Sequence, residues 1–433
     1  MNHPLRLGVA GLGTVGASVV KLVQRRANDL AASSGRAVRV TSVSARDRSR
    51  DRGIDLGGFA WFDNPVEMAA SGDVDCVVEL IGGDDGPARA TVETALQGGK
   101  HVVTANKALL AKHGLALAKM AEGRKVALAF EASAAGGIPV VKTLREALAG
   151  NAVSRLSGIL NGTCNYILSR MELEGLTFEA CLRDAQRLGF AEADPTFDVG
   201  GFDTAHKLAI LTSLAFGVRI DAEAIHVEGI SAITPLDLKM ADELGYRIKL
   251  LGVAERTATG IEQRVHPTMV AKSSAIAQVM GVTNAVTIDA DAVRAITLIG
   301  PGAGGDPTAS AVLSDIADVA RGAFAAPFGR PIDQLDVAER APMQRHEGGY
   351  YVRLTVVDRP GSMAKIATRM GDHQISLESI LQKGRGQRGG EGAPVPVILI
   401  THATTEGAIR AALEEVQGDG TVTEPPQVIR IER

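Results

Sequence analysis

Cysteine, net charge and long apolar runs are all scarce in this chain, and each scarcity excludes a class of protein. The 433 residues include three cysteines, Cys76, Cys164 and Cys181, whose spacing fits neither a metal-ligand motif nor a disulfide framework. This usage fits a reducing compartment, so we expect a cytoplasmic protein. The formal net charge is only -4, which gives no electrostatic reason to expect nucleic-acid binding. We expect neither a membrane span nor a signal peptide.

What is present is the composition of a globular protein. Apolar residues make up 45% of the chain and charged residues 22%, a balance that supports a buried core and a solvated surface. The length suffices for two or three domains.

A glycine-rich turn follows the first predicted strand, residues 5–10, and a helical pattern of apolar residues follows the turn. Between a strand and a helix, glycines at this spacing predict a dinucleotide-binding loop whose backbone approaches a pyrophosphate. The helix N-terminus then faces the phosphates. The alternative is a strand–helix turn that binds no nucleotide. The predicted cofactor contacts in this loop are Gly11, Leu12, Gly13, Thr14, Val15 and Gly16.

The end of the second predicted strand, residues 38–43, bears on the choice of cofactor. An NAD-selective site usually has an acid there, which binds the ribose 2′-hydroxyl. Here Arg46 and Arg48 follow the strand and offer positive charge to a 2′-phosphate. We therefore predict NADP(H) over NAD(H), with Arg46 as a cofactor contact. The alternative is that both arginines are solvated.

Strand and helix patterns alternate as far as residue 130, which predicts a doubly wound parallel sheet. Ligands bind beyond the carboxyl ends of such strands, where Lys107 and Glu131 fall. We expect Lys107 to contact the cofactor or the substrate, because a helix N-terminus disfavours a purely structural cation. The small residues at 132–137 suit a turn whose carbonyls hold a monovalent cation.

A later helix, predicted from residue 202, is apolar on most sides and is therefore expected to be buried. Asp203 and Lys207 lie four residues apart on its first turns, so they share one face. An acid and an amine carried into a cleft indicate an active site. The alternative is a surface ion pair, worth about 0.3–0.5 kcal/mol.

Five motifs in order resemble the homoserine dehydrogenase family, in its monofunctional form with a regulatory tail. They are residues 11–16, Thr104-Ala105-Asn106-Lys107, residues 158–163, Glu192-Ala193-Asp194-Pro195 with Asp203 to Lys207, and residues 300–309. The resemblance implies reversible NAD(P)-dependent interconversion of L-aspartate 4-semialdehyde and L-homoserine, in threonine, methionine and isoleucine biosynthesis. Because the nucleotide loop comes first, we do not expect the N-terminal kinase of bifunctional relatives.

The resemblance also implies roles for single residues. The catalytic groups are the proton donor Lys207 and, beside cofactor and substrate, Lys107. The substrate is held by three acids, Glu192, Asp203 and Asp198. The cofactor is contacted by two further glycines, Gly189 and Gly304. A sodium ion is held by Glu131 and the carbonyls of Ala134, Gly136 and Ile138.

The tail beyond residue 350 has the element order βαββαβ, which is ferredoxin-like, and it resembles an ACT regulatory domain. Such domains pair edge to edge and bind amino acids, so we expect a homo-oligomer with L-threonine as effector. The alternative is a dimerisation module without a ligand. A flexible charged loop is expected at residues 384–392.

The predicted α/β architecture therefore has four parts. A Rossmann-type nucleotide-binding domain spans residues 1–133 and is completed by about 306–325. An α+β substrate and dimerisation domain with an open sheet spans 134–305. A linker covers 326–349, and the ACT domain covers 350–433.

Two rival functions fit parts of the same pattern. Cys164 is a candidate nucleophile for an acylating semialdehyde dehydrogenase, but no histidine base lies nearby in sequence, which favours a small core residue. An NADP-responsive amino-acid sensor without enzymatic activity is the other rival. It would not need the acids around Lys207.

Overall fold

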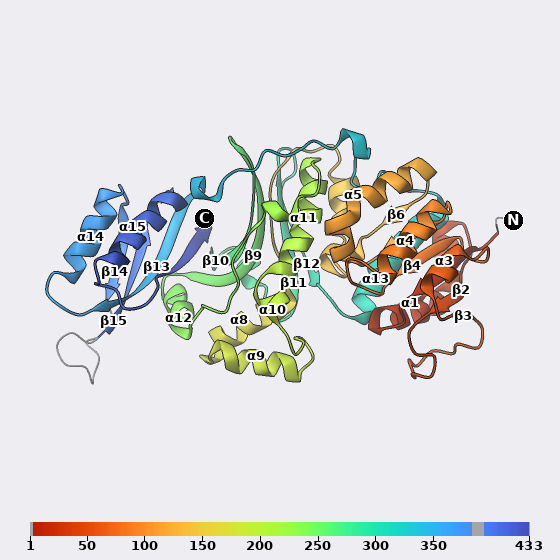
Figure 1. The fold of residues 1–433 in the computed structure, drawn as a ribbon, viewed down its shortest axis with the longest axis horizontal. Coiled ribbons are helices and arrows are strands. Elements are labelled where there is room, and N and C mark those ends of the chain that lie inside the picture. Colours follow the sequence, from red (N-terminus) through yellow and green to blue (C-terminus); the bar gives the residue numbers. More distant parts are fainter. Residues whose placement is uncertain (1–2, 383–393, 433) are drawn as a thin grey trace. The chain divides into compact units, whose positions relative to one another are not determined.

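The computed structural model describes residues 3–382 and 394–432, and these residues form two compact units (Figure 1). Unit 1 comprises the described residues up to Gly162, together with Asp203–Ile225 and Val282–Ala338. Unit 2 comprises Thr163–Phe202, His226–Gly281 and the described residues from Glu339 onward. The domain boundaries expected from the sequence stay a prediction, and the loop expected at 384–392 lies outside the described residues.

A parallel sheet with the strand order β3-β2-β1-β4-β5-β6 forms the first part of unit 1 (Figure 1). Its strands are β1 (Leu5–Ala10), β2 (Val38–Ser44), β3 (Ala60–Phe62), β4 (Cys76–Glu79), β5 (His101–Thr104) and β6 (Leu128–Ala129). The connecting helices are α1 (Thr14–Arg25), α2 (Ala27–Ser34), α3 (Pro65–Ala70), α4 (Pro87–Gln97) and α5 (Lys107–Arg124). The order reverses at β1, which confirms the predicted Rossmann-type sheet.

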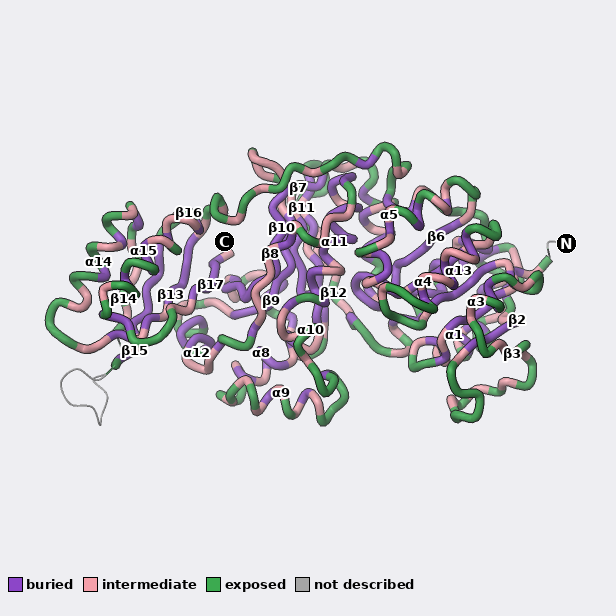
Figure 2. Tube along the Cα trace, viewed as in Figure 1, coloured by how far each residue is buried: buried purple, intermediate pink, exposed green. Residues whose placement is uncertain are grey.

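A helix from much later in the chain, α13 (Gly305–Arg321), packs against α1 in the core of this sheet. Val312 and Ile316 of α13 and Val19 of α1 are fully buried there. The central strands are likewise buried along most of their length (Figure 2). Burial of such aliphatic side chains is the main stabilising contribution to the sheet.

The rest of unit 1 places a buried helix and short turns beside an antiparallel sheet. β11 (Thr283–Ala290) pairs with both β7 (Val153–Ile159) and β12 (Arg294–Pro301). The turns and short helices are α6 (Ala132–Ala135), α7 (Val140–Lys142), η1 (Thr143–Ala147), η2 (Ala222–Ala224) and η4 (Ile332–Gln334). Most residues of α11 (Phe202–Phe216) are buried, which confirms the internal helix predicted from its apolar pattern.

Unit 2 contains strands in the order β9-β10-β17-β13-β15-β14, with β8 beside β10 and β16 beside β13. The strands are β8 (His226–Val227), β9 (Tyr246–Thr257), β10 (Gly260–Ala271), β13 (Glu347–Val357), β14 (Leu377–Gln382), β15 (Pro394–Thr401), β16 (Thr404–Thr405) and β17 (Gln427–Glu432). The helices and turns are α8 (Gly162–Glu174), α9 (Phe178–Arg187), α10 (Thr196–Val199), α12 (Pro235–Glu243), η3 (Ile276–Gln278), η5 (Met343–Arg345), α14 (Ser362–Asp372) and α15 (Glu406–Gly418).

The last part of unit 2 has the ferredoxin-like topology predicted from the sequence. Its elements follow as β13-α14-β14-β15-α15-β17, and its strands lie in the order β17-β13-β15-β14. β17 also pairs in parallel with β10, with Arg430 opposite Thr268. Backbone hydrogen bonds thereby join this ferredoxin-like part, β13 to β17, to strand β10. In the described part of the chain, no helix combines the length and apolar character needed to cross a membrane.

Ile316→Ala tests whether α13 belongs to the nucleotide-binding core. We expect the free energy of unfolding to fall by about 2–5 kcal/mol, because the substitution leaves a cavity at a fully buried position. Chemical denaturation of the purified protein measures the change. Ser310→Ala, at an exposed position of the same helix, is the control and should stay within about 0.5 kcal/mol. An equally small effect of Ile316→Ala would contradict the assignment.

Candidate active site

The first turns of α11 carry Asp203 and Lys207 on one face, as their spacing predicts. The Lys207 ammonium donates to Asp203 Oδ2 at 2.8 Å and to the backbone carbonyl of Leu160, just after β7, at 2.7 Å. Only 5% of the Asp203 side chain and 12% of the Lys207 side chain are exposed. The pair therefore belongs to the interior, and the surface interpretation is wrong.

Two further side chains converge on the Asp203 carboxylate. The Nζ atom of Lys107 lies 3.0 Å from Asp203 Oδ1, and Asn161 Nδ2 donates to Asp203 Oδ2 at 2.8 Å. Lys107 is the first residue of α5, where the helix dipole disfavours a cation. The ion pair with Asp203 offsets that repulsion.

The electrostatics of this cluster favour an ionised Asp203. Burial alone would raise the pKa of its carboxyl, but the charges of Lys207 and Lys107 outweigh burial and lower the pKa below its usual range. Two ammonium groups and one carboxylate give the cluster a formal charge of +1. Such a cluster can stabilise an oxygen atom that gains negative charge.

The loop between β1 and α1 has the geometry of a dinucleotide-binding turn. Gly11 has a φ of +98°, and a Cβ atom there would lie 2.5 Å from the carbonyl oxygen of Leu80. A Cβ atom on Gly16 would overlap the carbonyl of Gly11, so this glycine permits α1 to approach the strand. The space around Gly13 is open, as close approach of a phosphate requires.

The second glycine-rich turn lies beside this loop. Gly304 precedes α13 with a φ of +114°. A Cβ atom on the next residue, Gly305, would lie 2.7 Å from Ser18 Oγ and 3.2 Å from a methyl carbon of Thr14. The predicted contacts Thr14 and Gly304 are therefore close to one another at the starts of two helices.

Four arginines, Arg46, Arg48, Arg50 and Arg52, follow β2. Arg46 is exposed, and the guanidinium groups of Arg48 and Arg52 lie over the Trp61 ring at 5.7 and 5.9 Å from its centroid. Arg52 Nε also donates to the carbonyl of Leu12 in the nucleotide loop at 3.1 Å. Nothing local in the sequence predicts this contact of Arg52, because the two residues lie 40 positions apart in the chain.

The other two predicted substrate ligands, Glu192 and Asp198, belong to unit 2. Glu192 is exposed, and its backbone carbonyl accepts a hydrogen bond from Gln186 Nε2 at 3.1 Å. Asp198 lies on α10 and is half-buried. The roles assigned to these two acids stay predictions.

Gly189 and Cys164 have local structural roles. Gly189 follows α9 with a φ of +76°, and the next amide, of Phe190, donates to the carbonyl of Ala185 at 2.8 Å. This is a common way of ending a helix and requires no cofactor. Cys164 is fully buried, and its thiol donates to the carbonyl of Asp198 at 3.2 Å, as expected of a small core residue.

The predicted sodium site lies around a buried acid. The Glu131 carboxylate accepts from the amides of Val141 and Lys142 at 2.9 and 2.8 Å. Burial and the nearby Asp315 raise the pKa of Glu131 to about 7. Within the described ranges, no cluster of three or more His, Cys, Asp or Glu side chains is arranged to hold a metal ion. A sodium ion would therefore depend on the predicted carbonyls, those of Ala134, Gly136 and Ile138.

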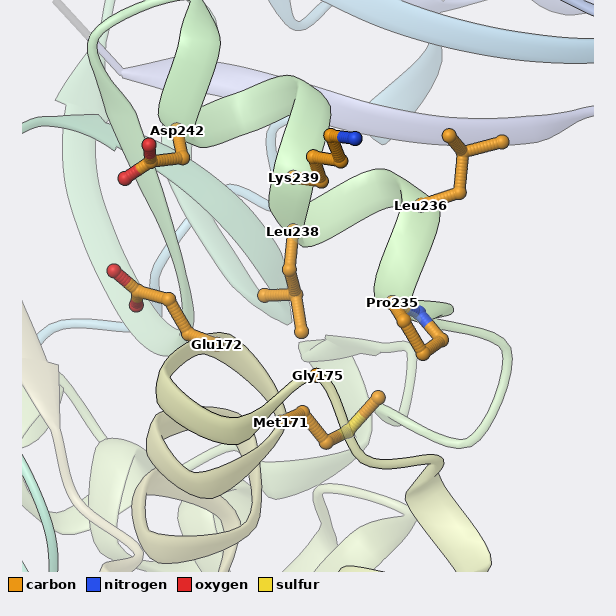
Figure 3. A pocket seen from close by; sticks show the side chains of 8 residues that line it. All are labelled: Met171, Glu172, Gly175, Pro235, Leu236, Leu238, Lys239 and Asp242. Carbon is orange, nitrogen blue, oxygen red and sulfur yellow. The ribbon is translucent and has the colours of Figure 1, made fainter.

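A pocket of about 400 Å³ lies between α8 and α12 in unit 2 (Figure 3). The residues that line it are Met171, Glu172, Gly175, Pro235, Leu236, Leu238, Lys239 and Asp242. None of the predicted site residues is among them.

Models of known protein families match three segments of this chain. Residues 11–131 match the family model described as homoserine dehydrogenase, NAD binding domain. Residues 139–317 match the model described as homoserine dehydrogenase, and residues 350–418 match the model described as ACT domain. A homoserine dehydrogenase of Pseudomonas aeruginosa is 44% identical, over 99% of each chain. The chain belongs to the homoserine dehydrogenase family.

Other members of the homoserine dehydrogenase family are similar to this chain over nearly its full length. The Neisseria gonorrhoeae protein is 41% identical over 99% of each chain. A crystal structure of the Thiobacillus denitrificans enzyme is 42% identical, with a TM-score of 0.93, over 99% of this chain and 98% of that one. Homoserine dehydrogenase activity, that of an oxidoreductase, replaces both the sensor and the acylating interpretation.

Asp203→Asn tests the Asp203 cluster. We expect kcat/KM for homoserine to fall by at least about a hundredfold, because the two lysines lose the charge that orients them. Steady-state kinetics measures the loss, and circular dichroism checks the fold. Asp29→Asn, which removes an acid from an exposed pair with Arg26, is the matched control. Equal activity of the two variants would contradict an organising role for Asp203.

Proposed function

We propose that the chain catalyses reversible NADP-dependent interconversion of L-aspartate 4-semialdehyde and L-homoserine, with Lys207 as proton donor. The observation that carries this proposal is the binding of both Lys207 and Lys107 by one buried carboxylate, Asp203. Membership of the homoserine dehydrogenase family supports the substrate pair.

When bound, the nicotinamide supplies or accepts the hydride. On reduction the substrate oxygen gains negative charge, which the Lys207 ammonium stabilises before giving up a proton to it. An ammonium group has three N–H donors. Asp203 and the Leu160 carbonyl engage two of those of Lys207, and we assign the third to the substrate oxygen. Lys107 adds a second positive charge to the same site.

The cofactor preference rests on the residues around the nucleotide loop. The open space at Gly13 and the start of α1 suit the pyrophosphate. Arg46 and Arg48 after β2 stand where an NAD-selective site has an acid, which supports NADP. Gly304, which precedes α13, and Gly189 are further proposed cofactor contacts, by resemblance to the family.

Glu192 and Asp198 are two further proposed substrate ligands, as anions for the ammonium group of the amino acid. Both belong to the motif that leads into α11, and a carboxylate is the natural partner of a substrate ammonium. We also retain a structural sodium ion at Glu131, supported by the tight turn at Gly136, whose φ is +58°.

The ACT module supports regulation of the enzyme by an amino acid, for which we propose L-threonine. Threonine would act as a feedback inhibitor of a pathway to threonine, methionine and isoleucine. β14 lies at the edge of its sheet with Ile380 half exposed, which supports pairing of two modules in a cytoplasmic homo-oligomer.

A buried ion-pair network supports coupling of the ACT module to the segment that carries Glu192 and Asp198. Arg430 of β17 is 1% exposed and donates to Glu228 at 2.8 Å and to Glu406 at 2.6 Å. Two residues beyond Glu228, the amide of Ile230 donates to the carbonyl of Val199 at 2.9 Å, just before α11. A movement of β17 would therefore shift the segment around Val199, which lies shortly before Asp203 in the sequence.

Lys207→Ala tests the proton-donor role. We expect kcat to fall by about 10²–10⁴-fold, because an acid–base group contributes that much, while the dissociation constant for NADPH is unchanged. Initial rates of homoserine oxidation with NADP and with NAD, and a fluorescence titration with NADPH, measure these quantities. Lys119→Ala, at an exposed position of α5, is the control. Near-normal turnover of Lys207→Ala would overturn the role.

Glu228→Gln tests the proposed coupling. The amide keeps a hydrogen bond to Arg430 but removes the charge, so we expect the threonine concentration for half-inhibition to rise at least about threefold. Homoserine oxidation without threonine should change little. Glu424→Gln, an acid of the same module that accepts from Thr355, serves as control. An unchanged threonine response would count against the coupling, and a wild-type enzyme that threonine does not inhibit would remove the effector.

A further inference from the structure

Glu79, at the carboxyl end of β4, is a buried acid to which the proposed chemistry gives no role. Its side chain is fully inaccessible. Its Oε1 accepts hydrogen bonds from the amides of Ile81 at 2.8 Å and Gly82 at 3.1 Å. Its Oε2 accepts one from the hydroxyl of Thr104 at 2.6 Å.

A carboxylate is costly to bury unless hydrogen bonds replace its hydration. Among the described residues no Lys, Arg or His forms an ion pair with Glu79, so its charge is stabilised by these amides and this hydroxyl. The hydrogen bonds of this acid therefore fix the loop after β4 to the end of β5. An apolar residue would fill the same volume without that cost.

The hydrogen bonds continue from Thr104 to the start of α5. The Thr104 hydroxyl accepts from the amide of Asn106 at 3.0 Å. Asn106 in turn donates to the carbonyl of Gly83 at 2.7 Å and caps α5 by accepting from Leu109 at 3.1 Å. The residue directly after this cap, and the first of α5, is Lys107, whose ammonium pairs with Asp203.

The same acid also holds the loop that faces the nucleotide turn. The amides of Ile81 and Gly82 donate directly to Glu79. The carbonyl of Gly83 accepts from Asn106, whose own amide donates to the Thr104 hydroxyl. The carbonyl of Leu80, which precedes these residues, lies so close to Gly11 that only glycine fits there. Glu79 thus links the residues that pack against the nucleotide loop to the start of α5, where Lys107 lies.

We propose that Glu79 is a positioning residue for the reaction, which sets Lys107 relative to the nucleotide loop through Thr104 and Asn106. This inference rests on the role that the proposed function gives to Lys107. An ionised carboxylate only accepts hydrogen bonds, so it forces the Thr104 hydroxyl to donate to it and leaves that oxygen to accept from Asn106. A carboxamide of the same shape would present a donor on one side and break this pattern.

Glu79→Gln is therefore the first variant, and Thr104→Val, which removes the hydroxyl at nearly constant shape, is the second. We expect each to lower kcat for homoserine oxidation by at least about tenfold, through misplacement of Lys107. We expect kcat of the double variant to be no lower than that of the less active single variant, because both changes break the same series of hydrogen bonds. Thr104→Ser keeps the hydroxyl and should recover turnover relative to Thr104→Val.

Matched controls separate positioning from folding. Glu93→Gln changes an acid that pairs with Arg89 on α4, and Thr91→Val removes a buried hydroxyl that donates to the carbonyl of Pro87. Thermal unfolding of all variants corrects kcat for the folded fraction. If Glu79→Gln fails to fold, Thr104→Val and Thr104→Ser carry the test alone.

The inference is overturned if Glu79→Gln and Thr104→Val keep kcat within about twofold of wild type, or if their effects multiply in the double variant. It is also overturned if the losses vanish after correction for folding. Lys107→Met distinguishes this failure from failure of the proposed function. Loss of turnover in Lys107→Met alone rejects only the role of Glu79, whereas a wild-type enzyme inactive with homoserine and NADP rejects the proposed function itself.

Discussion

One buried carboxylate, that of Asp203, holds the two lysines of the proposed active site together. It binds an ammonium from the start of α5, another from α11 and an amide from the segment after β7. Without it, Lys107 and Lys207 would repel each other, and Lys107 would face the positive end of its own helix unpaired. Loss of one partner from a buried pair commonly costs about 3–5 kcal/mol, so the cluster is both a structural and a chemical unit.

The fold explains how such a cluster is kept in place. α11 is buried on most sides, so its first turn cannot rotate without disturbing the core. α5 starts where β5 ends, at the same edge of the sheet as the glycine turn that precedes α1, as in doubly wound sheets generally. The return of α13 brings Gly304 to the same edge. Lys107 is thus fixed by the parallel sheet, and Lys207 by the internal helix.

What the sequence predicted correctly were features with a local physical cause. Gly16 is required by its close approach to the carbonyl of Gly11 inside one turn, and Asp203 with Lys207 share a face because of helix geometry. The ferredoxin-like order of the tail followed from alternating strand and helix patterns.

Long-range partners were not predictable in this way. The sequence carried no sign that Arg52 reaches Leu12, that Asn161 reaches Asp203, or that Glu79 reaches Thr104. Each of these contacts depends on strands and loops that only the folded sheet brings together. The resemblance to a family supplied roles for Glu192 and Asp198 that no local pattern contained.

A double-mutant cycle between Lys107 and Asp203 tests the central claim most directly. It compares kcat/KM for homoserine in the wild type, Lys107→Met, Asp203→Asn and the double variant. If Asp203 acts in part by holding Lys107, the loss in the double variant is at least about tenfold smaller than the product of the two single losses, a coupling of at least about 1.4 kcal/mol. Losses that multiply in the double variant would mean that the two residues act independently, and would contradict the account.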